Sequence, residues 1–116
     1  MAIEKFEAII GWQKAQDYAV EIYAAFGQLK DFSFKDQICR ASISISSNIA
    51  EGFDRQSNKE FIRFLYFALG SSSETKSLLY LAQRLKYCND SNQNLLLEKA
   101  NEICRIIHGL INSMKI

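Results

Sequence analysis

A chain of 116 residues, 48% of them hydrophobic and 23% charged, has the composition of one globular domain and not of a disordered segment. The formal net charge of +1 at pH 7 gives no bulk electrostatic attraction to nucleic acid or to anionic lipid. Membrane insertion and secretion are not expected, because no apolar run approaches the roughly 18 to 20 residues of a membrane span and residues 1–5 do not resemble a signal peptide.

The first half of the chain is expected to hold two helices after a lead-in, residues 1–10, that lies against them. In residues 11–29, apolar side chains recur every three or four positions and form one stripe: Trp12, Ala15, Ala19, Ile22 and Phe26. A start signal, Ser33 with Asp36, precedes a second helix over residues 34–51. Its inward residues are expected to be Ile38, Ala41, Ile45 and Ile49.

A turn is expected at residues 52–57. Gly52 is the natural left-handed stop of the second helix, and Ser57 with Glu60 forms a capping box for the third. Small residues on both sides of the turn predict a close antiparallel crossing in which Gly70 and Ser71 pack against a neighbouring helix. A leucine at either position is therefore expected to overpack the crossing.

The third helix, residues 58–87, carries more apolar surface than one bundle core can cover. From Phe61 to Leu69 the only polar residue is Arg63, so apolar side chains surround the helix except for one narrow sector. Farther along, the core is expected to continue with Leu78, Leu79, Leu81, Ala82 and Leu85. We therefore predict a homo-oligomer, with the interface drawn from this set: Ile62, Tyr66, Phe67 and Leu69.

The fourth helix is expected over residues 92–113, with Asp90 or Ser91 as its N-cap. Its inward residues recur at helical spacing: Leu96, Ala100, Ile103, Ile107 and Leu110. The chain contains no proline, and short turns join the four helical segments. The sequence therefore predicts an all-α, antiparallel up-down-up-down four-helix bundle formed by residues 1–116 as one domain.

The order and spacing of residues through most of the chain resemble a known bacterial family. The matching residues include Trp12-Gln13-Lys14-Ala15, Asn48-Ile49-Ala50-Glu51-Gly52, Arg55, Glu60-Phe61-Ile62-Arg63-Phe64-Leu65, Ala68, Gly70-Ser71 and Glu74. This pattern is similar to the four helix bundle proteins, also called the 23S rRNA intervening-sequence proteins. Many members have proline where this chain has Ser46.

The resemblance implies a function in assembly and in nucleic-acid biology. Some relatives are encoded within rRNA intervening sequences, and others are accessory variability proteins of diversity-generating retroelements. The latter form pentameric rings with basic surfaces, so the resemblance implies a pentamer and an accessory role with RNA or DNA. Those retroelement proteins are strongly basic, whereas the pI of this chain is about 7.7.

Residues with catalytic or metal-binding chemistry are few and scattered. His108 is the only histidine, which excludes a di-iron site built on paired Glu-x-x-His motifs, and it is expected at the solvated surface. The three cysteines, Cys39, Cys88 and Cys104, are too widely spaced for a zinc site and suit reduced thiols in the cytoplasm. We therefore expect no enzyme activity, cofactor, metal or small-molecule substrate, and a cytoplasmic location.

One polar patch remains as a candidate binding site for nucleic acid or a protein partner: Arg40, Asn48, Glu51, Arg55, Lys59 and Arg63. Asn48 and Glu51 share a helix face and could form a polar pocket at the end of the bundle. Alternatively, Glu51 pairs with Arg55 or Arg40, and Asn48 bonds to backbone. Two functional hypotheses follow: a self-assembling bundle that binds RNA or DNA, or an assembly module with protein partners alone.

Overall fold

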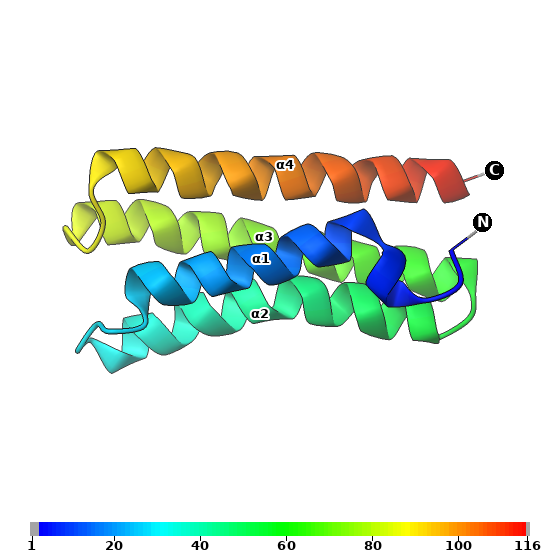
Figure 1. Cartoon of the computed structure of the whole chain (residues 1–116), viewed down its shortest axis with the longest axis horizontal. Helices are drawn as coiled ribbons and strands as arrows, with labels where there is room; N and C mark the ends of the chain where they lie inside the picture. The colour runs from blue at the N-terminus through cyan, green and yellow to red at the C-terminus, as the bar shows by residue number, and fades with distance from the viewer. Residues whose placement is uncertain (1–2, 116) are drawn as a thin grey trace.

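The computed structural model describes residues 3–115, which form four α-helices preceded by a short 3-10 helix, η1 (Figure 1). η1 spans Phe6–Ala8, α1 Ile10–Phe26, α2 Phe32–Asp54, α3 Asn58–Arg84 and α4 Asp90–Met114. No residue from 3 to 115 lies in a β-strand, so the predicted all-α class is confirmed. The helix ends lie within three residues of their expected positions.

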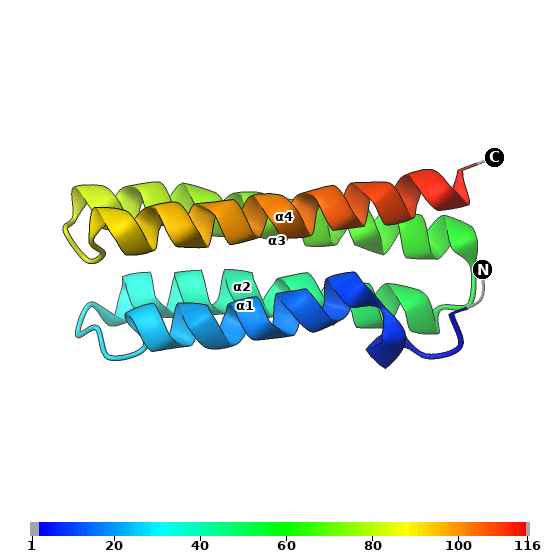
Figure 2. The same cartoon turned by 45° about the horizontal axis from the view of Figure 1, so that its top comes forward.

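The helices are arranged as a square in chain order. Each helix contacts the next, and α4 also contacts α1, so α1 and α3 lie at opposite corners. The connecting turns alternate between the two ends of the bundle, so successive helices run antiparallel (Figure 1). The bundle measures 44 × 22 × 19 Å, and a second view shows the α1/α2 pair alongside the α3/α4 pair (Figure 2).

The core is formed by one stripe from each helix, as helical periodicity predicts. Its largest fully buried apolar side chains are Tyr18, Ile22, Phe26, Ile38, Ile45, Ile49, Leu65, Leu79, Ile103, Ile107 and Ile111. The expectation that Leu81 and Leu85 continue the core is wrong, because Leu81 on α3 and Leu85 just after its end are both exposed. Leu79 and Ala82, which were also expected in the core, do take inward positions at this level.

Gly52 is required for a close approach of two helices, and the prediction that it ends α2 in a left-handed conformation is wrong. α2 continues to Asp54, and the residue with positive φ is Gln56, at 57°. A Cβ placed on Gly52 would lie 2.4 Å from the Cβ of Phe64 on α3. Any larger side chain at residue 52 would therefore force α2 and α3 apart.

The predicted packing role of Gly70 is also wrong, because a Cβ placed on it would have no atom within 4 Å. The small residues that let the helices approach are Ser42 and Ser72, both fully buried. The Ser72 hydroxyl lies 3.2 Å from Sγ of Cys104 on α4. α2 is continuous through Ser46, whose hydroxyl donates to the Ile43 carbonyl.

Each of the last three helices begins with a side-chain cap. Ser57 caps α3, as predicted, by accepting from the backbone N–H of Glu60 at 3.3 Å. The caps expected at Ser33 and at Asp90 or Ser91 are wrong, since Asp31 caps α2 and Asn89 caps α4. These polar side chains stand just upstream of the expected positions and satisfy the same free N–H groups.

Candidate functional site

The described part of the chain carries no arrangement typical of a metal or nucleophile site. Residues 3–115 contain no group of three or more His, Cys, Asp or Glu side chains placed to hold a metal ion. His108 is exposed, as predicted. Burial raises the pKa of the Cys39 thiol, which disfavours the reactive thiolate. Within the same residues, no helix combines the length and hydropathy needed to cross a bilayer.

Two residues of the predicted patch, Arg55 and Arg63, belong to a cluster that also contains Glu60, Phe64 and Phe67, which the patch did not include. We call these five residues the arginine–aromatic cluster. The short turn after Asp54 and the cap at Ser57 bring Arg55 back over the first turns of α3. The Cζ atoms of Arg55 and Arg63 lie 4.8 and 5.5 Å from the centre of the Phe64 ring. Arg63 also lies 5.2 Å from the ring of Phe67, so the two guanidinium groups cover the buried Phe64 ring and form one exposed surface with Phe67.

Carboxylates largely neutralise this cluster. Both Glu60 oxygens lie 3.2 Å from Nη1 of Arg63, and Oε1 of Glu60 lies 3.8 Å from Arg55. Glu51 pairs with Arg55 at 3.3 Å across one helical turn. With Lys59, three cations and two carboxylates leave one net positive charge. The surface is therefore well suited to contact protein and only weakly attractive to phosphate.

The remaining residues of the predicted patch have local roles. Nδ2 of Asn48 donates to the Ser44 carbonyl at 2.8 Å, so the backbone-bonding interpretation describes it better than a polar pocket. Arg40 is exposed, but it precedes Arg55 by fifteen residues on α2, which is about 22 Å along the helix. Arg40 is therefore separate from the arginine–aromatic cluster.

The helix rotation distinguishes the four residues of the predicted interface. Ile62 and Leu69 are half-buried and pack against the core. Tyr66 and Phe67 project outward, with 46% and 44% of their surface exposed. Nζ of Lys115 donates to the Tyr66 hydroxyl at 3.1 Å, which places a further cation beside Tyr66.

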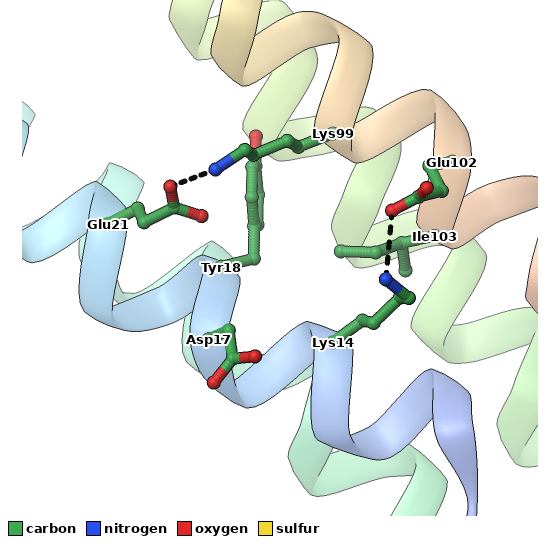
Figure 3. Close-up of a pocket in the computed structure, with 7 residues that line it drawn as sticks. All are labelled: Lys14, Asp17, Tyr18, Glu21, Lys99, Glu102 and Ile103. Carbon is green, nitrogen blue, oxygen red and sulfur yellow. Dashed lines mark hydrogen bonds and ion pairs between the residues drawn. The ribbon is translucent and has the colours of Figure 1, made fainter.

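A second polar feature, between α1 and α4, was not predicted from the sequence. It is a hollow of about 120 Å³, with a Lys99–Glu21 ion pair on one side and a Lys14–Glu102 pair at 3.5 Å on the other (Figure 3). Tyr18 lies between the two ion pairs, and its hydroxyl donates to the Leu96 carbonyl at 3.0 Å. The available signal was the presence of opposite charges on the first and fourth helices, Lys14 and Glu21 on one and Lys99 and Glu102 on the other.

This hollow joins two helices and has no arrangement suited to proton transfer. Burial raises the pKa of Tyr18 above its ordinary value of 10.0, and the charge of Glu21 adds to this effect. The hydroxyl therefore stays neutral and remains a donor to Leu96. The lysines that line the hollow, Lys14 and Lys99, each face a carboxylate.

Comparison with known proteins identifies the family. A profile described as 23S rRNA-intervening sequence protein matches residues 7–109, which is most of the chain. The chain belongs to the 23S rRNA-intervening sequence protein family. No curated protein matched it.

A solved structure shares the fold of this family member. It is a protein of unknown function from the S23 ribosomal protein family of Bacteroides thetaiotaomicron, 28% identical, with a TM-score of 0.82. The similarity covers 88% of this chain and 98% of the other. The four-helix architecture is therefore shared by two divergent sequences, while the comparison assigns neither of them an activity.

Proposed function

We propose that this member of the 23S rRNA-intervening sequence protein family is a non-enzymatic bundle that assembles with copies of itself. The observation that carries the proposal is the outward projection of Tyr66 and Phe67 beside the arginine–aromatic cluster. Large apolar side chains that are more than a third exposed also occur on α1, on α2, on the second half of α3 and just after its end, including Val20, Tyr23, Ile43, Tyr80, Leu81 and Leu85.

Covering these side chains would favour association. Full burial of a large apolar side chain contributes about 1.5 to 3 kcal/mol, so covering the exposed half contributes on the order of 1 kcal/mol per residue. Aromatic residues and arginine are also the types enriched in protein interfaces. Because Glu51 and Glu60 already compensate Arg55 and Arg63, burying this cluster leaves fewer unpaired charges than burying a bare basic ridge. Five copies, the number implied by the family resemblance, would have a mass of about 67 kDa.

A charged substitution at the interface tests the proposal. Lysine in place of Phe67 would stand next to Arg63 and bring an unpaired cation into the contact, so Phe67→Lys should sediment as a lighter species than wild type. Leu95→Lys is the matched control, since Leu95 is similarly exposed but lies near the start of α4. Sedimentation velocity at equal concentration makes the comparison. If Phe67→Lys sedimented as wild type does, this would contradict an interface at this part of α3.

Nucleic-acid binding is a second candidate, which rests on a different property of the same end of the bundle. Lys59, Arg63 and Lys115 lie on the helix ends around Tyr66 and Phe67. Cations beside exposed aromatic rings are suited to contact phosphates and to stack bases of a single strand. The low net charge of the cluster predicts weak binding without sequence preference.

A gel-shift titration with single-stranded RNA and DNA tests this candidate at two salt concentrations. The expected result is a complex at about 50 mM salt that is lost at about 200 mM, with little dependence on sequence. Absence of binding at the lower concentration would leave assembly with protein as the function of this surface.

A further inference from the structure

We propose that the bundle has a hinge at its middle, where residues 42–48 of α2 face residues 69–75 of α3. We call these two ranges the serine-rich segments; they open together while the helices on either side stay formed. Among residues 3–115, four of the five buried polar side chains lie in them: Ser42, Ser46, Ser72 and Thr75. The hinge is a property of a single copy, so it goes beyond the proposed function and does not require assembly.

The buried hydroxyl groups of the two segments lie at one level of the bundle. Gly52 on α2 lies beside Phe64 on α3, and the two helices run antiparallel (Figure 1). Because each helix rises about 1.5 Å per residue, Ser42 and Ser46 lie opposite residues 70–74 of α3. The four hydroxyl groups therefore fall within about 8 Å of one another along the bundle axis.

Apolar contacts hold α2 and α3 together on both sides of this level. Ile38 and Leu79 are fully buried toward one end of the bundle, and Ile49 and Leu65 toward the other. Between these two levels, Ile45 is the one large side chain that the serine-rich segments bury fully. The middle of the α2/α3 contact therefore gains less hydrophobic stabilisation than the parts that flank it.

The local sequence of the α2 segment also disfavours a helix. It contains none of the strong helix formers, and polar and apolar side chains alternate from Ser42 to Ser46, which is typical of a β-strand. Five of its seven side chains donate to helix carbonyls three or four residues earlier: Ser42, Ser44, Ser46, Ser47 and Asn48. Such bonds compete with the backbone hydrogen bonds and often bend a helix. The helical state of this segment therefore depends on packing against its neighbours.

The α3 segment has the same weakness. Gly70 is followed by three serines, and glycine is the least favourable residue in a helix interior after proline. The Thr75 hydroxyl donates to the Ser71 carbonyl at 2.9 Å, and Ser72 contacts Cys104 on α4. Within residues 3–115, no hydrogen bond joins the two serine-rich segments. Opening of one segment removes the packing that keeps the other helical, so the two open together.

The position of the hinge determines what it can move. The arginine–aromatic cluster lies on one side of it, and the turns at residues 27–31 and 85–89 lie on the other. The end of the bundle that carries the cluster can therefore tilt relative to the end that carries these turns, while the apolar core of each end stays packed.

Hydrogen exchange of the full chain, followed by mass spectrometry at pH 7, tests the hinge. Peptides that cover residues 42–48 and 69–75 should exchange at least about tenfold faster than peptides that cover residues 36–41 and 61–67 of the same two helices. Helices normally open from their ends, so faster exchange in the middle is specific to a hinge there. Exchange in the serine-rich segments that is equal to or slower than in these flanking parts would overturn the proposal.

A double variant, Ser42→Ala with Ser46→Ala, tests the joint opening. It raises helix propensity in the α2 segment and leaves no buried group unpaired, since Gln16, which donates to Ser46, is exposed to water. We expect exchange of residues 42–48 to slow roughly fivefold. Exchange of residues 69–75 should slow as well, although no residue of α3 has changed.

Ser113→Ala is the matched control. The Ser113 hydroxyl also donates to a helix carbonyl, that of Leu110 at 2.7 Å, but it lies near the end of α4. This variant should leave the exchange of both serine-rich segments as in wild type. Slowing confined to α2 in the double variant, or equal slowing by Ser113→Ala, would show that the two segments do not form one hinge.

Discussion

Adding one methyl group at Gly52 tests the account of how α2 and α3 pack. The Cβ of Gly52→Ala would lie 2.4 Å from Cβ of Phe64, 3.2 Å from its Cγ and 3.3 Å from Cδ1 of Phe61. The closest of these atoms is attached directly to the α3 backbone, so a rotamer change cannot remove the clash. The two helices must move apart at a point where both are buried.

The change in the free energy of unfolding caused by Gly52→Ala follows from two opposing contributions. Replacing glycine by alanine inside a helix contributes about 1 kcal/mol of stability. Overpacking a well-filled core typically costs about 1 to 3 kcal/mol, and a backbone-attached clash belongs at the upper end. We expect Gly52→Ala to lower the free energy of unfolding by about 1 to 2 kcal/mol.

Gly109→Ala is the matched control, because Gly109 lies in α4 and a Cβ there would have no atom within 4 Å. It should raise the free energy of unfolding by up to about 1 kcal/mol. Urea denaturation at one fixed protein concentration measures the free energies of unfolding of both variants. The concentration is fixed because assembly makes apparent stability depend on it. A Gly52→Ala protein as stable as Gly109→Ala would refute the close approach of α2 and α3.

Three further results are expected. Gln93→Met should raise the free energy of unfolding, measured in urea, by about 1 to 2 kcal/mol. The Gln93 side chain is 1% exposed, and its amide atoms have no hydrogen-bond partner within residues 3–115, so an apolar side chain should be more stable there; unchanged or lower stability would show that the amide is satisfied. Tyr87→Phe should destabilise the protein at pH 7 and 9, and the difference from wild type should shrink as the pH rises through the folded pKa of Tyr87. That pKa is raised above 10.0 by the hydrogen bond to Asp31, so the stabilisation belongs to the protonated hydroxyl. A difference from wild type that does not shrink as the pH rises above 10.0 would contradict this assignment. In gel shifts at low salt, Glu60→Gln should strengthen RNA binding more than Glu74→Gln does. Of these two glutamates, Glu60 is the one that contacts Arg55 and Arg63. Equal effects of the two variants would assign the change in binding to net charge alone.

Helical periodicity is sufficient to predict most of the fold from the sequence. Ile38, Ile45 and Ile49 are buried as predicted because their spacing fixes one face of α2. The excess of apolar residues from Phe61 to Leu69 likewise predicts exposed aromatic side chains. Their identity, Tyr66 and Phe67, depends on the rotation of α3 about its axis, which a pattern covering almost the whole helix surface does not define.

The sequence is less informative where the outcome depends on which residues face one another across helices. The sequence predicts a helix end at Gly52 and a close crossing at Gly70, yet Gly52 faces Phe64 and Gly70 faces open space. The same limit applies to the ion pairs of Lys14 with Glu102 and of Glu21 with Lys99, which join the first and fourth helices. By contrast, the pairing of Glu51 with Arg55 is local to one helical turn and was among the predicted alternatives.

The central claim is that this bundle assembles with itself, and the mass of the wild-type protein in solution tests it most directly. Multi-angle light scattering at micromolar concentration should give a mass that is a multiple of 13.3 kDa, with about 67 kDa expected for five copies. A single monodisperse species at 13.3 kDa would contradict the claim and would leave the exposed side chains of α3 without the partner we propose.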